Sequence, residues 1–130
     1  MIVGVDVTHV DRLRSLMTRY PAAERRFFTE RERIHCHNHP DPVMHFAGTL
    51  AAKEAVVKTL RLGRIAAWAR KIEIVRDSSG APAAFVTNGS TSETLAVSIS
   101  HDAGIAIAVA VSPGPHLTVF ADSACGSDFP

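Results

Sequence analysis

The stretch Ala51-Ala52-Lys53-Glu54-Ala55-Val56-Val57-Lys58 lies near the middle of this 130-residue chain and is the most informative part of its sequence. In a helix it places Glu54 and Lys58 one turn apart, so the acid and the base share a face. Taken alone, they would be an ordinary exposed ion pair of little energetic value. Their significance comes from the surrounding residues and from two polar side chains far away in the sequence.

Signals for both ends of a long helix flank this stretch. Asp41 can cap its start, and Pro42 suits its first position, where the missing amide hydrogen costs nothing. Gly63 offers a stop. The helix would carry an apolar stripe and a flank of small residues that lets another surface approach closely. The stripe consists of Phe46, Leu50, Val57 and Leu60, and the flank of Ala47, Ala51 and Ala55.

Lys53 falls inside the apolar stripe, seven residues from both Phe46 and Leu60. A lysine at such a place can lay its stem along apolar surface and keep its ammonium in water. We therefore expect Lys53 to expose its charge.

The other segments predict two short helices and five strands. The strands are expected at 2–7, 71–76, 83–87, 95–100 and 105–111, and the short helices begin at about Asp11 and at Thr29. Pro21 stops the first short helix, and Thr29 with Glu32 forms a capping box for the second. Turn signals at 77–80 and 101–104 join the last four strands into two hairpins. This order predicts an α+β domain with an antiparallel sheet packed on the long helix.

Length and composition exclude several classes of protein. The size fits one domain, and a net charge of +1 with interspersed charges is not typical of a nucleic-acid-binding protein. Cys36 and Cys125 are too few and too far apart for a disulfide framework. No signal peptide or membrane span is visible. We expect a cytoplasmic protein with one domain at 1–112 and a flexible tail at 113–130, where the Pro, Gly and Ser content rises.

Two polar side chains outside the long helix stand at unusual places. Asp6 interrupts an apolar strand, where alone it would pair with a group on a neighbouring strand. His101 ends a strand-like alternation, where alone it would be a plain turn residue. An acid in a strand, an acid with a lysine on a helix and a histidine at a hairpin tip are together much less common than any one of them.

A run of histidines at 35–39, with Cys36 inside it and His45 beyond it, contains the ligand types that zinc uses. These ligands alternate too closely and lack a paired second knuckle. The sequence therefore favours a surface loop here over a zinc site.

Five segments, taken in order, resemble one family. They are Gly4-Val5-Asp6-Val7 with Arg12, Phe28–Glu32, Phe46-Ala47-Gly48 with Leu50–Ala55 and Lys58, Ile72-Glu73-Ile74 with Gly80-Ala81-Pro82, and Val97–His101. The Ala-Ala-Lys-Glu-Ala block is fairly specific in this context. On these segments the chain resembles the holo-acyl-carrier-protein synthases, the small class of 4'-phosphopantetheinyl transferase, over residues 1–111.

The resemblance implies a Mg²⁺-dependent transfer of the phosphopantetheine arm of coenzyme A to a serine of an acyl carrier protein, with release of adenosine 3',5'-bisphosphate. It makes Asp6 and Glu54 the metal ligands, which suits a hard cation beside a pyrophosphate. Lys58 would bind the same phosphates, and His101 would donate to a phosphate oxygen. The serine proton could pass to Glu54, to a metal-bound water or to an acid of the partner.

The resemblance also implies partners. Because the carrier protein is acidic, Arg12 would bind its recognition helix, with help from Arg14 or Arg19. Members of the family are typically homotrimers with the coenzyme site between neighbours, so we expect a homotrimer. The carrier would belong to a fatty-acid or polyketide pathway.

Two departures from the family pattern concern the coenzyme site. Thr49 stands where the family usually has an arginine near the coenzyme pocket. Arg61 and Arg64 flank Gly63 where glycines are common, and we hypothesise that one of them contacts a coenzyme phosphate. The loss of the arginine leaves open a non-catalytic homologue that binds carrier proteins or scaffolds an assembly. A metal-dependent phosphohydrolase acting on coenzyme A would use the same acids.

Overall fold

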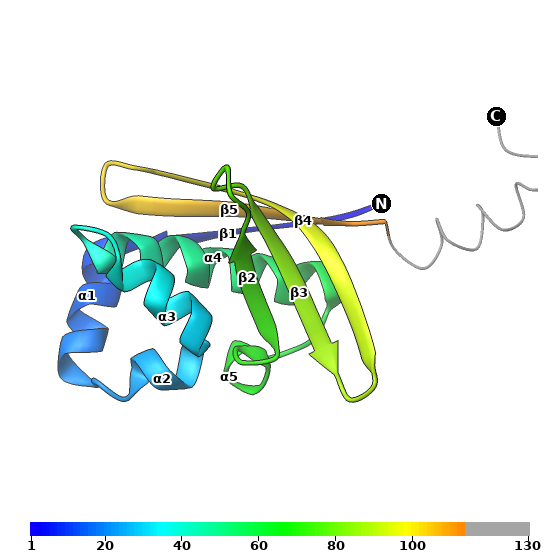
Figure 1. Ribbon diagram of the computed structural model, residues 1–130, viewed down its shortest axis with the longest axis horizontal. Coiled ribbons are helices and arrows are strands. Elements are labelled where there is room, and N and C mark those ends of the chain that lie inside the picture. The colour runs from blue at the N-terminus through cyan, green and yellow to red at the C-terminus, as the bar shows by residue number, and fades with distance from the viewer. Residues whose placement is uncertain (114–130) are drawn as a thin grey trace, which may run out of the picture.

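The computed structural model describes residues 1–113, which form a five-stranded antiparallel sheet with helices against one face (Figure 1). The elements are β1 (Ile2–His9), α1 (Val10–Arg19), α2 (Ala23–Phe27), α3 (Glu30–His37), α4 (Pro42–Leu60), α5 (Ile65–Trp68), β2 (Ile72–Arg76), β3 (Pro82–Asn88), β4 (Thr91–Asp102) and β5 (Ile105–Ser112). The strand order is β1-β5-β4-β3-β2. The predicted α+β class and all five strands are confirmed. The expected tail and Cys125 lie outside the described residues.

Helix α4 lies against β1, β5 and β4 (Figure 1). Alternate alanines of β5 and Gly4 of β1 face it, and all are buried. A Cβ at Gly4 would collide with the Thr59 hydroxyl and the Ala55 carbonyl oxygen. The close approach predicted for the small flank of this helix therefore occurs, and the sheet is the approaching surface.

The other side of α4 is covered by α1 and α3, which contribute a second core cluster. There the rings of Phe28 and Phe46 pack with their centroids 4.6 Å apart. Ala52 and Val56, which lie outside the predicted stripe, are also fully buried. The buried surface of α4 is wider than the predicted single stripe, because a sheet packs on one side of the helix and other helices pack on the other.

Lys53 is fully buried, so the prediction of an exposed ammonium was wrong. Its Nζ lies 2.5 Å from Glu32 Oε1 and donates to the carbonyl oxygens of Phe27 and Ala69. The Glu32 carboxylate also accepts a hydrogen bond from the Ile74 N–H at 2.7 Å. Burial raises the pKa of Glu32 and lowers the pKa of Lys53, while their pairing opposes both shifts. These hydrogen bonds are what allow the two groups to lie in the core.

Local hydrogen bonds cap the start of α3, whereas the residue before α4 is held by a contact with another helix. The capping box of α3 is confirmed, since the Glu32 N–H donates to the Thr29 hydroxyl and the Thr29 N–H donates to the Glu32 carboxylate. Asp41 occupies the N-cap position of α4, as predicted, but its side chain makes no capping hydrogen bond there. Its carboxylate instead accepts hydrogen bonds from Arg14 at 3.0 and 3.2 Å, which tie α1 to the start of α4.

The two shortest helices and the histidine run differ from the sequence-based expectations. The helices α2 and α5 are five and four residues long, too short to produce a periodic pattern or to be stable alone. The histidine run at 35–39 is not a surface loop, because His35 and His37 complete α3. Among the described helices, none is both long and apolar enough to cross a membrane.

The sheet face that points away from α4 carries exposed apolar side chains. Val3, Val5 and Val7 of β1 are 59%, 48% and 49% exposed, and Ile107 of β5, which pairs with Val7, is 40% exposed. These residues form a contiguous row across two strands. A row of this kind is typical of an interaction surface rather than of scattered surface residues.

Replacing Lys53 with methionine should lower the free energy of unfolding by about 3 to 5 kcal/mol, because the Glu32 carboxylate would stay buried without a counter-charge. The double variant Lys53→Met, Glu32→Gln should lose less, since an amide oxygen still accepts backbone hydrogen bonds and carries no charge. Urea-induced unfolding measures both losses.

The control for this experiment is Lys71→Met, which removes an exposed ammonium that lies over the Trp68 ring. It should cost less than about 1 kcal/mol. Equal losses at the two lysines would contradict the role given to the buried pair.

Candidate active site

The packing of α4 on β1 brings together side chains that are far apart in the sequence. Lys58 Nζ lies 2.8 Å from Asp6 Oδ1 and also donates to the Val5 carbonyl oxygen at 3.1 Å. Glu54, one turn earlier on α4, lies near the same Asp6 carboxylate and interacts electrostatically with it. The structure therefore groups Asp6, Glu54 and Lys58, although the lysine pairs with Asp6 and not with Glu54.

The two carboxylates carry negative charge that the protein compensates only in part. Asp6 Oδ2 is buried and has no hydrogen-bond partner within residues 1–113. Burial, and then the neighbouring Asp6 carboxylate, raise the pKa of Glu54 to about 7, although the Lys58 ammonium opposes the rise. The hydrogen bond to Asp6 raises the pKa of Lys58. Two acids that share one lysine form an environment that favours a further cation.

The donor set of this acid pair fits a magnesium ion. Mg²⁺ takes oxygen ligands and is commonly held by one or two carboxylates together with several waters. The unpartnered Oδ2 of Asp6 and the Glu54 carboxylate would supply the protein ligands. A bound dication would also satisfy the buried oxygen and favour the ionised form of Glu54.

A groove of about 530 Å³ opens beside Glu54, along α1. Its lining consists of Val7, Thr8, His9, Arg12, Leu13, Ser15, Leu16, Arg19, Tyr20, Leu50 and Glu54. The groove thus combines two arginines and an apolar floor with one member of the acid pair. Arg12 and Arg19, expected to bind the carrier protein, both lie in it.

Two of the groove residues were missed as site residues by the sequence analysis. The Leu16 side chain is 42% exposed and lines the groove. Tyr20 is 56% exposed beside it. The only sequence signal for Tyr20 was an aromatic residue directly before Pro21, at the end of a helix.

Cations gather just after the C-terminal end of α4. The helix ends at Leu60 because Arg61 adopts a left-handed conformation with φ of 54°. The helix was predicted to end at Gly63, so it ends earlier than predicted. Gly63 itself has φ of 96°. Arg61, Gly63 and Arg64 are exposed in the turn that follows Lys58. Positive charge at this end also complements the helix dipole.

His101 and Thr49 lie apart from the acid pair. His101 ends β4 and packs edge-on against His45, with ring centroids 6.1 Å apart. Within residues 1–113, no hydrogen bond or ion pair joins His101 to the acids. Thr49 is buried, and its hydroxyl donates to the His45 carbonyl oxygen and lies 3.8 Å from the Cys36 thiol. In this chain, the position of the missing arginine therefore faces the core between α3 and α4.

Comparison with known proteins identifies the family. The model of the 4'-phosphopantetheinyl transferase superfamily matches residues 2–110. The chain belongs to this superfamily. The holo-[acyl-carrier-protein] synthase of Chlorobaculum tepidum is 39% identical to this transferase over 114 residues, which cover 85% of this chain and 97% of the relative. The Streptomyces avermitilis synthase is 37% identical over 120 residues, covering 86% and 96% of the two chains.

Solved structures agree with this assignment. The Helicobacter pylori holo-[acyl-carrier-protein] synthase in complex with coenzyme A matches with a TM-score of 0.72 and 28% identity, over 85% of this chain and 98% of that chain. The Neisseria meningitidis synthase matches with a TM-score of 0.70 and 27% identity, over 86% and 100%. The predicted family, the fold and the prediction of a 4'-phosphopantetheinyl transferase enzyme of the holo-acyl-carrier-protein synthase type are therefore confirmed.

The raised pKa of Glu54 should make the stability of the metal-free transferase depend on pH. The folded protein keeps this proton up to about pH 7, whereas the ordinary pKa of a glutamate is 4.5. The contribution to stability is therefore fully present below pH 4.5 and is lost as the pH rises through about 7. With EDTA present, wild-type Tm should fall relative to that of Glu54→Gln over this window, as followed by circular dichroism.

A matched control for this titration is Glu93→Gln, which changes an exposed glutamate on β4. Its Tm difference from the wild type should stay constant with pH. A constant difference for Glu54→Gln as well would show that Glu54 titrates at its ordinary pKa.

Proposed function

We propose that this transferase moves the 4'-phosphopantetheine group of coenzyme A to a serine of an apo-acyl carrier protein, with Asp6, Glu54 and Lys58 as its catalytic centre. The observation that carries the proposal is the carboxylate pair with one buried, unpartnered oxygen and a lysine beside it. The coenzyme A complex of the Helicobacter pylori relative supports coenzyme A as the substrate.

Each residue of this centre has a property that suits the reaction, in which a serine oxygen attacks phosphorus and adenosine 3',5'-bisphosphate leaves. Mg²⁺ held by Asp6 and Glu54 would neutralise the charge of the pyrophosphate. The Lys58 side chain is 57% exposed, so its ammonium can reach a phosphate oxygen.

The turn after α4 would hold the phosphates of coenzyme A. Arg61 and Arg64 flank Gly63 on this exposed turn, close in sequence to Lys58. Their positive charges can form charge-assisted hydrogen bonds with phosphate oxygens, and Gly63 leaves room for close approach. Both arginines would thus take part in coenzyme binding without contributing to the metal site.

The groove beside Glu54 would receive the acidic carrier protein. Arg12 and Arg19 can pair with acidic side chains of a carrier helix, while Leu16 and Tyr20 offer apolar contact area. A helix bound there would bring its attached serine close to Glu54, because Glu54 is itself part of the groove wall.

We also propose that the protein acts as a homotrimer in the cytoplasm. The exposed row of Val3, Val5, Val7 and Ile107 would pack against other copies of this chain. His101, which lies apart from the acids of its own chain, would then contribute to the coenzyme site of a neighbour. Cys36 is a free, buried thiol, and a free cysteine suits a reducing compartment.

The transfer reaction is tested by intact-mass spectrometry of apo-carrier proteins from fatty-acid and polyketide pathways, incubated with the protein, coenzyme A and Mg²⁺. Wild type should add one phosphopantetheine to a carrier. Glu54→Gln should lower the rate at least about 100-fold, because it removes a carboxylate ligand of the cation that would neutralise the pyrophosphate. Transfer at an unchanged rate would refute the assignment of Glu54.

Release of adenosine bisphosphate without a carrier would instead indicate a phosphohydrolase, and coenzyme binding without either reaction would indicate a non-catalytic homologue.

In the same assay, Arg12→Glu should raise the KM for the carrier protein and leave the KM for coenzyme A unchanged, because it reverses a charge in the groove. The control Arg26→Glu reverses an exposed charge on α2, outside the groove, and should change neither value. Equal effects of the two substitutions would place carrier binding elsewhere.

The trimer is tested by light scattering after size exclusion. Wild type should elute at three times the mass of one chain, and Val3→Glu should dissociate it by burying a charge in the apolar contact. Ile34→Glu changes a residue that is equally exposed, at 59%, but lies on α3, and should remain trimeric. A monomeric wild type, or dissociation by both variants, would contradict this use of the sheet face.

A further inference from the structure

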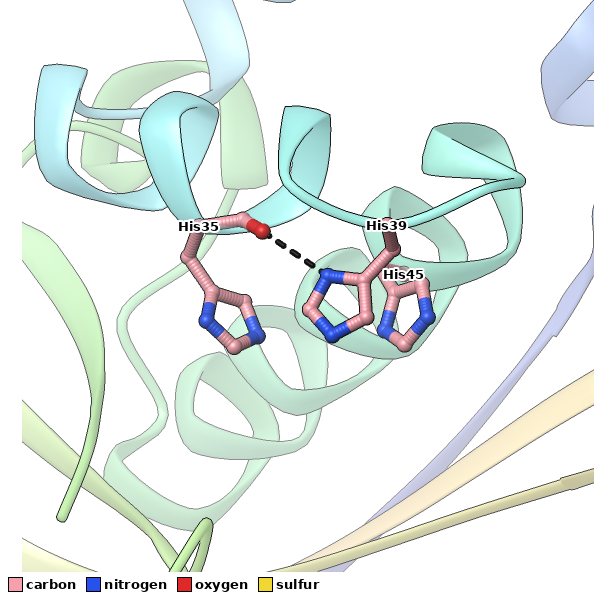
Figure 2. Close-up of side chains that lie close together, drawn as sticks. All are labelled: His35, His39 and His45. Carbon is pink, nitrogen blue, oxygen red and sulfur yellow. Dashed lines mark hydrogen bonds between the residues drawn. The ribbon is translucent and has the colours of Figure 1, made fainter. Parts of the chain in front are cut away.

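Three histidines outside the proposed catalytic centre meet where α3 is joined to α4. His35 comes from the last turn of α3, His39 from the connecting turn and His45 from the start of α4. Their imidazole rings extend to the same side of this junction (Figure 2). One ring nitrogen of each lies within 4.8 Å of those of the other two, and the rings of His39 and His45 stack with centroids 3.6 Å apart.

The protonation of His39 is set by its own hydrogen bond. Its Nδ1 lies 2.9 Å from the His35 carbonyl oxygen, which can only accept, so Nδ1 carries the proton and donates (Figure 2). The Nε2 atom of the same ring therefore keeps its lone pair free for a ligand. Metal-binding histidines are commonly oriented in this way, with one nitrogen donating to a backbone carbonyl and the other facing the metal.

The other two histidines also offer neutral nitrogens. Burial, and then the neighbouring histidines, lower the pKa of His45 to about 4, and burial lowers the pKa of His35. The side chains that influence the pKa of His45 electrostatically are basic ones, and no carboxylate is among them. They are His39, His35, His101 and Arg76. The cluster is therefore a set of three closely spaced imidazole nitrogen donors, half-buried between two helices.

The nearby residues of the same run do not belong to the cluster. His37 Nε2 bonds to the Glu24 carboxylate at 2.9 Å, on another side of α3. The Cys36 thiol is buried against Thr49, and its raised pKa of about 12 keeps it protonated. The sequence analysis argued against zinc because the ligands of the run alternate too closely. The structure removes that objection, since only His35 and His39 of the run, four residues apart, are used and His45 supplies the third ligand from α4.

We propose that His35, His39 and His45 form a binding site for one divalent transition-metal ion of the zinc class, which would clamp α3 to α4. Imidazole nitrogen is a preferred ligand of Zn²⁺, Co²⁺ and Ni²⁺, whereas Mg²⁺ requires oxygen ligands. In a tetrahedral zinc site with Zn–N distances of about 2.05 Å, ligand nitrogens lie about 3.3 Å apart. The three ligand nitrogens, which lie within 4.8 Å of one another, would have to close to that separation when the ion binds. The three histidines leave one coordination position for water or an anion.

This site is chemically distinct from the Asp6–Glu54 pair. One site offers carboxylate oxygens and the other imidazole nitrogens. A hard cation such as Mg²⁺ should therefore bind the carboxylates, and a borderline cation such as Zn²⁺ should bind the histidines. Because the ion would bind the folded protein only, it should raise the melting temperature, and above Kd the rise should grow with the logarithm of the ion concentration. The readout is therefore independent of transferase activity.

The test uses the full chain, stripped of metal and kept in excess Mg²⁺ so that the carboxylate pair is occupied. Co²⁺ is titrated in while its visible absorption is followed, and Zn²⁺ is then added in competition. Wild type should bind one equivalent of Co²⁺ with the intense absorption of a tetrahedral nitrogen site, and Zn²⁺ should displace it and raise Tm.

His39→Gln and His45→Gln should each weaken Co²⁺ binding at least about tenfold and abolish the rise in Tm, while His37→Gln should bind like wild type. Circular dichroism of the metal-free variants checks that they fold. Unchanged Co²⁺ binding in the folded double variant His39→Gln, His45→Gln would overturn the proposal, as would absence of stoichiometric binding by wild type.

Discussion

The buried ion pair between Glu32 and Lys53 is the contact on which the rest of the structure depends. Lys53 extends from the centre of α4 and binds Glu32 of α3 together with the carbonyl oxygens of Phe27 and Ala69. Glu32 in turn binds the backbone of β2 at Ile74. Because a buried charge is tolerated only with its partners in place, these contacts allow one arrangement of the surrounding elements. The pair thus holds α3 and the edge of the sheet at fixed positions around α4.

With α4 held in place, the register of β1 decides whether the proposed catalytic centre can form. Successive residues of a strand point to opposite faces, so Asp6 faces Glu54 and Lys58 only while Gly4 also faces α4. A shift of one residue would turn Asp6 to the outer face and bring valines against the helix. Gly4 favours this register, because β1 and α4 approach each other too closely there for any side chain. The carboxylate pair and the glycine are therefore two consequences of one packing contact.

Four parts of the molecule differ in the chemical groups that they expose. The inner face of β1 offers carboxylate oxygens with an uncompensated charge, while the α3–α4 junction offers neutral imidazoles. The outer face of the sheet is apolar, and the groove along α1 is rimmed by Arg12 and Arg19. Each environment suits a different kind of partner: a hard cation, a transition metal, another copy of the chain and an acidic protein. All four are built around the single helix α4 or the strands that pack on it.

The sequence by itself determined the features that rest on local chemistry. The alternation of residues in the strands, the turn signals and the Thr29–Glu32 capping box depend on neighbours in the chain, and each is present in the structure. The five matching segments, with the Ala51–Lys58 block and Asp6 among them, were enough to indicate the family. The tertiary structure decided everything that depends on what packs against a residue. It buried Lys53, exposed Leu16, directed Asp41 to Arg14 and brought His45 to His35. Periodicity shows which face of a helix is apolar, but only the packed neighbours determine whether a charge on that face meets water, a counter-charge or another ligand.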